Sequence, residues 1–351
     1  MPKVYITTPA YYPNDVAHIG HAYTTIATDV LARWYRLKIG KENVMFITGL
    51  DEHGSKLEKA ARERGMEPQA FVDMMAGKFK DTWKALNISY DGFRRTSDKK
   101  HIEIVKKIFK KIYDAGDIYK GQYEGWYCTP CESFWTDMQL VGGKCPECGR
   151  DVEKLKEESY FFRLSKYQNQ LLGLYKKHPE FISPSHRKNE IINRVKEGLK
   201  DLSISRMKVK WGIPVPLDKK STIYCWFDAL NFYLSVLDYP GDKFKKFWPP
   251  NLQLMSKEIN WFHSVIFPAI LLSAKLPIAK KIFVHGWLTV EGKKMSKSLG
   301  NFLIPEDIVK KYGVDQFRYF LMREIPFGED GDFSEEALVK RINGEQGAHP
   351  G

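Results

Sequence analysis

The sequence lacks an uncharged apolar run long enough to cross a membrane, and it has little cysteine for its length. None of its 351 residues lies in a run of the roughly 18 to 20 apolar residues that a transmembrane helix needs. The first ten residues predict a strand rather than a signal peptide, so we expect a cytoplasmic protein. With 43% hydrophobic residues, the chain can bury one large core and at least one smaller module.

Acidic residues are fewer than basic residues, and the excess of positive charge is unevenly distributed along the chain. Lys and Arg number 55 against 43 Asp and Glu, which gives a formal net charge of +12. Residues 186–220 contain ten Lys and Arg but four Asp and Glu, and so carry half of that excess. A clustered basic excess suits a polyanionic partner such as RNA or DNA. The alternative is a lysine-rich surface that serves only solubility.

Four of the five cysteines form two C-x-x-C pairs, Cys128 with Cys131 and Cys145 with Cys148. Each pair can supply two thiolates to one tetrahedral ion, and Gly149 permits the tight turn that follows such a pair. Four sulfur ligands leave no open position, so the pattern predicts one structural Zn²⁺ ion. Free or disulfide-linked cysteines are the alternative.

The order of the predicted elements is that of a parallel α/β sheet. Residues 4–8 predict a strand, residues 18–40 a helix whose apolar face includes Val30 and Trp34, and residues 44–47 a second strand. Residues 55–114 are predicted to be helical. Strands are predicted again at residues 222–227, 251–255 and 281–287, with helices between them. This alternation indicates right-handed crossovers within one sheet.

Changes in composition divide the chain into segments. The α/β pattern stops near residue 116, where aromatic residues, the cysteine pairs and the basic stretch follow, and it returns after residue 221. We therefore expect a Rossmann-like parallel sheet split by an insertion. The expected segments are residues 1–115 and 222–290 for the two halves of the sheet, 116–221 for the zinc-binding insertion, and 291–351 for a lysine loop and a helical region.

The lysine loop reads EGKKMSKSLGN and follows the last predicted strand. It places Lys293, Lys294 and Lys297 within five residues, between Gly292 and Gly300. A cationic loop of this kind can stabilise a polyphosphate on which charge develops during a reaction. The alternative is a solvated turn.

His18 and His21 lie three residues apart in AHIGHAY, at the predicted start of the first helix. A helical metal site would want histidines at i and i+4 with a further ligand, and here no acid lies between them. An anion site fits better, since the helix N-terminus offers free N–H groups and Gly20 allows close approach of a ligand. Burial in a core is the remaining alternative.

The HIGH and KMSKS sequences together resemble the class I aminoacyl-tRNA synthetases. Further stretches narrow the resemblance to the methionyl-tRNA synthetases of the bacterial type. They are TTPAYYPNDVAHIGHAYTT, TGLDEHG, GWYCTPCE, EESYFFRLSKYQ, WFDAL, HGWLTVEGKKMSKSLGN and REIPFGEDGDFS. The resemblance runs from Lys3 to about Gly344. Within it, residues 116–221 correspond to the connective domain and residues 291–351 to the KMSKS loop and the helical region that contacts the tRNA stem.

The resemblance implies a ligase that joins L-methionine to the α-phosphate of ATP·Mg²⁺, releases pyrophosphate and transfers the methionyl group to the 3′ end of tRNA(Met). It implies no protein nucleophile, so catalysis is positioning and charge stabilisation. By the resemblance, His18, His21, Lys294 and Lys297 are catalytic, with the two lysines on the departing pyrophosphate. The implied ATP-binding residues are His18, Gly20, His21, Glu258, Lys294, Ser296 and Lys297.

The resemblance also implies a methionine pocket in which Asp51 holds the α-ammonium group. An unbranched thioether suits aromatic walls with one polar tip near the sulfur. Two positions depart from the family pattern, since Glu258 stands where an aspartate is expected and Ala10 where a larger aliphatic residue is expected. The implied pocket residues are Ala10, Tyr12, Asp51, Trp226, Ala229, Tyr233, Ile259 and His263.

Members of the family continue after RINGE with a helical bundle that reads the anticodon. We therefore expect a catalytic core in which anticodon recognition is lost and a separate subunit or domain supplies tRNA affinity. Three alternatives remain. They are a synthetase for leucine, isoleucine, valine or cysteine, a small nucleotidylyltransferase, and an inactive remnant that only binds tRNA through its basic insertion. The insertion of about 100 residues is short for an editing domain, and no cysteine lies beside HIGH.

Overall fold

The computed structural model describes residues 2–128, 133–135, 140–146, 149–295 and 301–346. Its main sheet has six strands in the order β3-β2-β1-β12-β13-β7, and every neighbouring pair is parallel. The predicted parallel α/β fold is therefore confirmed. The strands are β1 (Val4–Tyr11), β2 (Val44–Leu50), β3 (Gly92–Arg95), β7 (Ile182–Ser183), β12 (Leu252–Ser256) and β13 (Ile282–His285).

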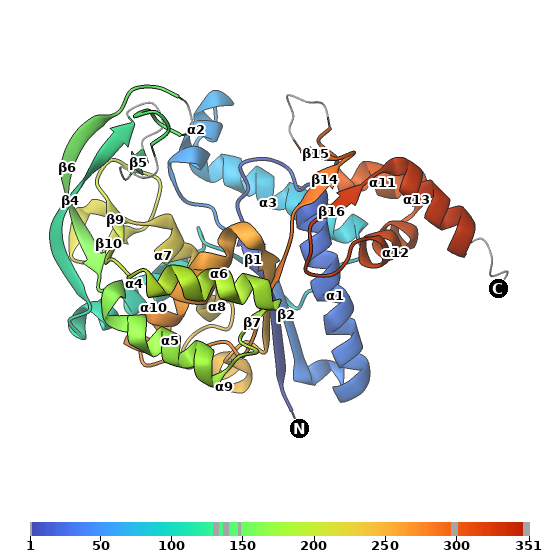
Figure 1. Ribbon diagram of the computed structural model, residues 1–351, viewed down its shortest axis with the longest axis horizontal. Coiled ribbons are helices and arrows are strands. Elements are labelled where there is room, and N and C mark those ends of the chain that lie inside the picture. Colours follow the sequence, from blue (N-terminus) through green and yellow to red (C-terminus); the bar gives the residue numbers. More distant parts are fainter. Residues whose placement is uncertain (1, 129–132, 136–139, 147–148, 296–300, 347–351) are drawn as a thin grey trace.

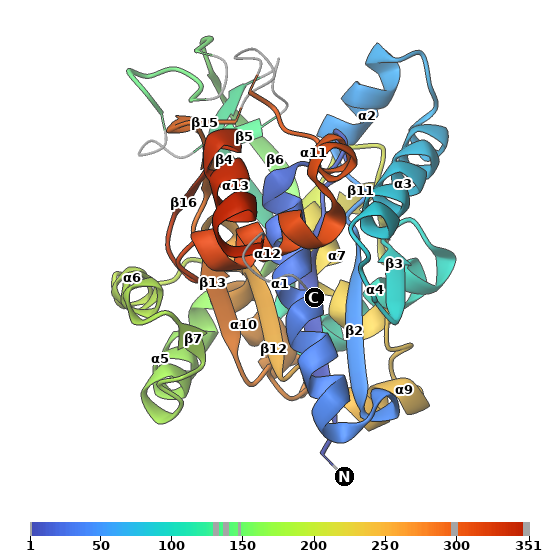
Figure 2. The same ribbon diagram turned by 90° about the vertical axis from the view of Figure 1, so that its right-hand side faces the viewer.

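Helices cover both faces of this sheet, and α1 crosses one face along its whole length (Figure 2). Seven of the eight residues of β1 are buried, as expected for a strand with a layer on each side. The helices that matter below are α1 (Ile19–Ile39), α2 (Ser55–Glu63), α3 (Pro68–Ala85), α4 (Lys99–Asp114), α6 (Ser185–Lys196), α7 (Cys225–Leu230), α8 (Phe232–Ser235), α10 (Phe267–Ser273), α11 (Pro305–Tyr312), α12 (Val314–Glu324) and α13 (Glu335–Arg341).

Helix α1 begins after His18 and ends at Gly40, close to the predicted bounds. Its predicted apolar face is partly wrong, because Val30 and Trp34 are 42% and 50% exposed. The buried face includes Thr28 and Asp29 instead. These polar side chains can be buried because each is hydrogen-bonded, Thr28 to a carbonyl one turn earlier and Asp29 to arginine and serine side chains.

Two predicted elements differ from the structure. Residues 222–227 are not a strand of the main sheet. Instead β11 (Asp218–Ile223) lies in a small antiparallel sheet with β9 (Ser205–Arg206) and β10 (Pro214–Val215), and α7 already begins at Cys225. Residues 92–95, predicted to be helical, form the edge strand β3. Strand β3 forms because it pairs with β2, which lies much earlier in the sequence, and local periodicity does not reveal such a partner.

A second sheet lies at one end of the molecule, opposite the C-terminal helices (Figure 1). It contains β4 (Ile118–Cys128), β5 (Ser133–Trp135), β6 (Glu153–Phe162) and β8 (Leu202–Ser203), paired antiparallel. Strand β7, which also lies within residues 116–221, instead pairs with β13 in the main sheet. The domain boundaries stay a prediction.

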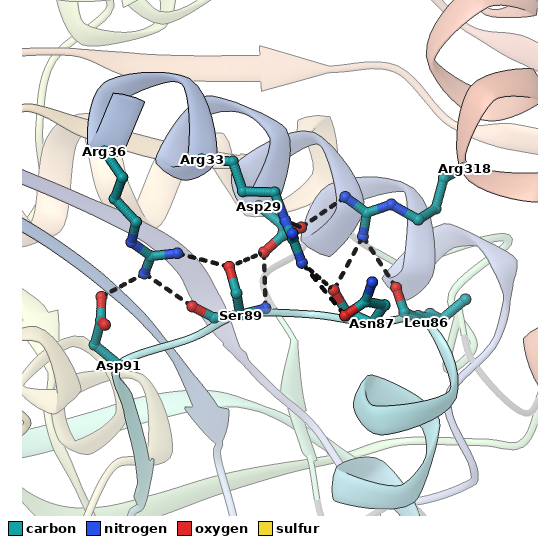
Figure 3. A network of polar contacts seen from close by, with 8 residues as sticks. All are labelled: Asp29, Arg33, Arg36, Leu86, Asn87, Ser89, Asp91 and Arg318. Atoms are coloured by element: carbon teal, nitrogen blue, oxygen red, sulfur yellow. Dashed lines mark hydrogen bonds and ion pairs between the residues drawn. The ribbon is translucent and has the colours of Figure 1, made fainter. Parts of the chain in front are cut away.

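Helices α11 to α13 follow the lysine loop, and a polar network joins α12 to α1 (Figure 3). Arg318 of α12 and Arg33 of α1 both donate to the buried carboxylate of Asp29. Their guanidinium groups also donate to the backbone carbonyls of Leu86 and Asn87. The network thus fixes the loop between α3 and β3 as well. Among the described helices, none is long and apolar enough to span a bilayer.

Candidate active site

A cavity of about 1700 Å³ lies beyond the carboxyl ends of β1, β2, β12 and β13, where ligands gather in open α/β sheets. The structure brings most of the predicted substrate-binding residues together in its lining. Lys294 has its backbone in β15 (Lys293–Lys294), while Ser296 and Lys297 lie outside the described residues. The predicted residues that line the cavity are Ala10, Tyr12, His18, Gly20, His21, Asp51, Trp226, Ala229, Tyr233, Glu258, Ile259 and His263.

The two histidines of HIGH cap helix α1 with their own rings. His18 is the N-cap residue, and its Nδ1 accepts from the N–H of Gly20 at 3.1 Å. The N–H of His18 in turn donates to Nδ1 of His21 at 3.3 Å. Because each Nδ1 is an acceptor, the proton of each neutral ring is on Nε2. The rings stack with centroids 3.8 Å apart.

Both imidazoles are neutral at pH 7. Burial lowers the pKa of His18 to about 4, against smaller opposing effects of Glu258 and Asp15. Burial and the neighbouring His18 hold the pKa of His21 well below its usual range. The pair therefore offers two uncharged Nε2–H donors at a helix N-terminus, which is suited to hydrogen bonds with phosphate oxygens.

Gly20 leaves room for the His18 ring in this cap. A Cβ at this position would lie 3.0 Å from Cε1 of His18 and 3.1 Å from its Nδ1, which is closer than ordinary packing allows. The His21 ring also packs against Tyr11 and Phe79, with centroids 5.0 Å and 5.7 Å away. Strand β1 and helix α3 thus both orient the histidine pair.

The residues on both sides of the lysine loop make hydrogen bonds to other elements, and those that follow the loop contact helix α1. The carbonyl of Leu303 accepts from the N–H of Ile19 at 3.3 Å, and the ring of Phe302 lies edge-on to His18 at 5.6 Å. At the other end, Asp332 accepts from the Thr289 hydroxyl at 2.6 Å and from the Gly292 N–H at 2.8 Å. The loop is therefore tethered beside the histidine pair.

Asp51 presents a buried carboxylate to the cavity. It is 8% exposed, and its Oδ1 accepts no hydrogen bond from the described residues. Burial raises the pKa of Asp51 well above its usual range, and the nearby Asp228 raises it further. A bound cation would offset both effects. An α-ammonium group would supply a positive charge and an N–H donor to Oδ1.

An aromatic recess completes the cavity. The rings of Trp226 and Phe262 stack with centroids 3.6 Å apart and planes 7° apart. Nδ1 of His263 contacts the carbonyl of Ile259 at 3.0 Å and must donate there, so its Nε2 accepts from the Tyr233 hydroxyl at 2.7 Å. Burial lowers the pKa of His263 to about 4. The N–H donor of His263 and the O–H donor of Tyr233, which form the polar end of the recess, are therefore already hydrogen-bonded within the protein.

Several residues of the cavity were missed by the sequence analysis. His53 of TGLDEHG lines the cavity, and Asp228 of WFDAL is its buried hydrogen-bond partner. Both lay within recognised stretches, which is the signal that could have found them. His285 had a weaker signal, its place at the end of the strand 281–287. Its Nε2 lies 2.7 Å from the Thr24 hydroxyl, which links β13 to α1. Arg206 also lines the cavity and lies over the ring of Tyr224.

Two of the four cysteines lie within the described residues. Cys128 and Cys145 are both buried, 0% and 1% exposed. Gly149 has φ of +68°, and its N–H donates to the Cys145 carbonyl at 2.8 Å, which is the tight turn expected after a C-x-x-C pair. Cys131 and Cys148 lie outside the described residues. Within the part of the chain that the structure describes, no group of three or more His, Cys, Asp and Glu is arranged to hold a metal.

Comparison with known proteins gives consistent matches. A family model described as "tRNA synthetases class I (M)" matches residues 4–155 and 150–347. The methionine–tRNA ligase of Caldanaerobacter subterraneus subsp. tengcongensis is 58% identical over 342 residues, covering 97% of this chain and 53% of the relative. That of Clostridium acetobutylicum is 52% identical over 345 residues, with the same coverage. The chain thus spans about half the length of these curated relatives.

Comparison with solved structures gives matches to the same family. The structure of Mycobacterium tuberculosis methionyl-tRNA synthetase in complex with methionyl-adenylate matches with a TM-score of 0.93 at 44% identity, covering 99% of this chain and 69% of that chain. The apo form of the same protein matches with a TM-score of 0.80 at 39% identity, covering 99% of this chain and 67% of that chain.

Proposed function

Because the chain belongs to the methionyl branch of the class I tRNA synthetases, we propose that it activates L-methionine with ATP and transfers the methionyl group to tRNA(Met). One observation carries this proposal. A single cavity joins two neutral Nε2–H donors at a helix N-terminus, a buried carboxylate whose Oδ1 accepts no hydrogen bond from the described residues, and an aromatic recess. These are complementary to a triphosphate, an ammonium group and a thioether.

In the proposed first step, a carboxylate oxygen of methionine attacks the α-phosphorus of ATP. The bond from this phosphorus to the bridging oxygen breaks, and pyrophosphate leaves with Mg²⁺, which enters as part of the nucleotide substrate. His18 and His21 donate from Nε2 to phosphate oxygens, and no proton moves to or from the protein. Since these donors are held by the backbone before the substrate arrives, little reorganisation is needed as charge develops.

Lys294 and Lys297 would stabilise the charge on the departing pyrophosphate, with Ser296 as a further contact. The tethered ends of their loop support this role, because Leu303 and Phe302 lie against Ile19 and His18. For the nucleoside, Gly20 would leave room for adenine and Glu258 would accept from a ribose hydroxyl. One oxygen of Glu258 already accepts from Trp287 Nε1 at 2.8 Å, which would fix the carboxylate for this contact.

In the amino-acid site, Asp51 would bind the α-ammonium group. The thioether would pack against aromatic rings and accept no hydrogen bond, since the Tyr233 and His263 donors satisfy each other and the backbone. Polar side chains would lose hydration in this recess without an equivalent return, so they are disfavoured. The residues proposed for the site are Ala10, Tyr12, Asp51, Trp226, Ala229, Tyr233, Ile259 and His263.

In the second step, a ribose hydroxyl of the terminal adenosine would attack the carbonyl carbon of methionyl-adenylate, and AMP would leave. The basic residues of 186–220 support a tRNA partner. We also propose that Cys128, Cys131, Cys145 and Cys148 hold one structural Zn²⁺. The buried sulfurs of Cys128 and Cys145 and the turn at Gly149 fit it. The proposed activity would place the protein in the cytoplasm.

The identities to methionine enzymes disfavour a synthetase for leucine, isoleucine, valine or cysteine and a small nucleotidylyltransferase. Direct detection of the product distinguishes an active enzyme from an inactive remnant. The purified chain, incubated with ATP·Mg²⁺, methionine and pyrophosphatase, is expected to form methionyl-adenylate that mass spectrometry detects. A folded, zinc-loaded sample that forms none would contradict the proposed function.

A further inference from the structure

Trp211 contacts residues 51–54, the loop that carries Asp51, at three points. Its indole Nε1–H donates to the carbonyl oxygen of Glu52 at 2.5 Å. Its own carbonyl oxygen accepts from the N–H of Gly54 at 3.0 Å. Its ring also lies edge-on to the imidazole of His53, with centroids 5.4 Å apart. One residue from the segment between β9 and β10 therefore holds three successive residues after Asp51.

The far side of the loop is fixed as well. Nδ1 of His53 donates to Oδ2 of Asp228 at 2.6 Å, and Oδ1 of Asp228 accepts from Nε2 of His101 at 2.6 Å. Asp228 is 1% exposed, so this pairing is held within the core. His53 thus contacts Trp211 on the one hand and a buried, hydrogen-bonded carboxylate on the other.

Asp51 contacts the same peptide, because its carboxylate accepts a hydrogen bond from the backbone N–H of His53. Its backbone N–H donates to the Tyr11 carbonyl at 2.8 Å, but the Oδ1 atom of its carboxylate accepts no hydrogen bond within the described structure. The direction of this carboxylate is therefore set by the backbone that follows it. Gly54 limits the alternatives, since it has φ of +116° and a Cβ there would lie 3.2 Å from the Tyr12 hydroxyl.

We propose that Trp211 is a positioning residue for Asp51, and through it for the α-ammonium group of the amino acid. The inference rests on the proposed function, because it assumes that an amino acid occupies the cavity. Without the indole N–H, the peptide that joins Glu52 to His53 loses a partner and can rotate. Asp51 then no longer presents its carboxylate in one direction, whereas the ATP contacts of His18 and His21 on α1 are unaffected.

The test is Trp211→Phe, which keeps an aromatic ring against His53 and removes the N–H donor. Calorimetric titration with L-methionine in the absence of ATP is expected to show a roughly three- to tenfold weaker affinity, the range that one hydrogen bond contributes. The KM for ATP in pyrophosphate exchange is expected to stay unchanged.

Two analogues separate positioning of the ammonium site from general damage to the cavity. Methioninol keeps the amino group and lacks the carboxylate, so its affinity is expected to fall by the same factor as that of methionine. 4-(Methylthio)butanoate lacks the amino group and makes no contact with Asp51, so its affinity is expected to be the same in Trp211→Phe and in the wild-type chain. Ligand-observed NMR measures both.

Trp248→Phe is the matched control, since it also removes an indole N–H donor to a carbonyl, that of Pro277 at 2.9 Å, and Trp248 does not line the cavity. It is expected to leave all three affinities unchanged. Equal losses for all three ligands in Trp211→Phe, or unchanged methionine affinity, would overturn the inference. A wild-type chain that binds no methionine overturns the proposed function as well, which distinguishes the two failures.

Discussion

Arg318 on α12 donates from Nη2 to Oδ2 of Asp29 on α1 at 2.6 Å, while its Nη1 donates to the Leu86 carbonyl (Figure 3). The Asp29 carboxylate also accepts from Ser89 and Arg33. Burial alone would raise the pKa of Asp29, but the hydrogen bonds from these three residues lower it overall. One buried carboxylate thus joins the C-terminal helices to the helix that begins with the histidine pair.

Replacing Arg318 by Ala is expected to lower the free energy of unfolding by about 2 kcal/mol, since a hydrogen bond to a buried charge is lost. Urea denaturation at pH 7 measures this loss. Lys310→Ala removes an exposed ion pair to Asp307 at 3.9 Å and is expected to cost less than about 0.5 kcal/mol. Equal effects of the two substitutions would contradict a stabilising role for the Arg318 contact.

The same contact predicts a pH dependence of stability. The folded-state pKa of Asp29 is lowered, so its contribution is present above the pKa of the unfolded state and is lost as the pH falls toward the folded-state value. The difference in unfolding free energy between the wild type and Arg318→Ala is therefore expected to shrink on acidification. A difference that grows as the pH falls below 4 would contradict the lowered pKa of Asp29 in the folded state.

Neutral histidines predict a flat pH profile for activation. With the pKa of His18 near 4 and that of His21 held well below its usual range by burial and by His18, neither ring gains a proton between pH 8 and pH 6. The turnover number for methionine-dependent exchange is expected to show no rise through pH 6.5. A rise as the pH falls through that value would mean that an imidazolium, rather than a neutral N–H donor, contacts the phosphates.

Asp51→Asn is expected to separate function from stability. The substitution keeps the shape but removes the charge, so the KM for methionine should rise roughly 100-fold, as for loss of a buried charge partner. The KM for ATP should change little. Since burial and Asp228 oppose ionisation of Asp51, the melting temperature should stay the same or rise. A marked fall in melting temperature would show that the carboxylate serves the fold.

The zinc proposal predicts one ion per chain by elemental analysis. Cys145→Ser removes one of the proposed thiolates and is expected to reduce the zinc content to less than half of the wild-type value. Cys225→Ser is the matched control, because Cys225 lies in α7 apart from the two pairs, and it should leave the content unchanged. Zinc retained in full by Cys145→Ser would exclude the four-cysteine site.

Local sequence patterns were sufficient to predict much of the fold and of the candidate site. The resemblance carried by the HIGH and TGLDEHG stretches was enough to predict that His18 and Asp51 belong to one substrate site, and both line the same cavity. The apolar periodicity of residues 18–40 also predicted a helix that starts at His18. Such features can be predicted because backbone periodicity and turn chemistry depend on residues that are close together in the sequence.

Contacts between distant segments could not be predicted in this way. The helical face with Val30 and Trp34 looked apolar and buried, yet Asp29 occupies the buried side because Arg318, 289 residues later, donates to it. Strand β3 exists because it pairs with β2. His101 meets Asp228 only through packing of α4 against the centre of the fold, and no local pattern encodes that pairing.

The most direct test of the proposed active site is ATP–pyrophosphate exchange with a panel of amino acids. The wild-type chain is expected to exchange label with methionine and far more slowly with leucine, isoleucine, valine and cysteine. Lys297→Ala should lower the rate much more than the affinity for methionine, since its contact forms mainly as charge develops on the leaving group. Absence of methionine-dependent exchange in a folded, zinc-loaded chain would contradict the assignment of this cavity.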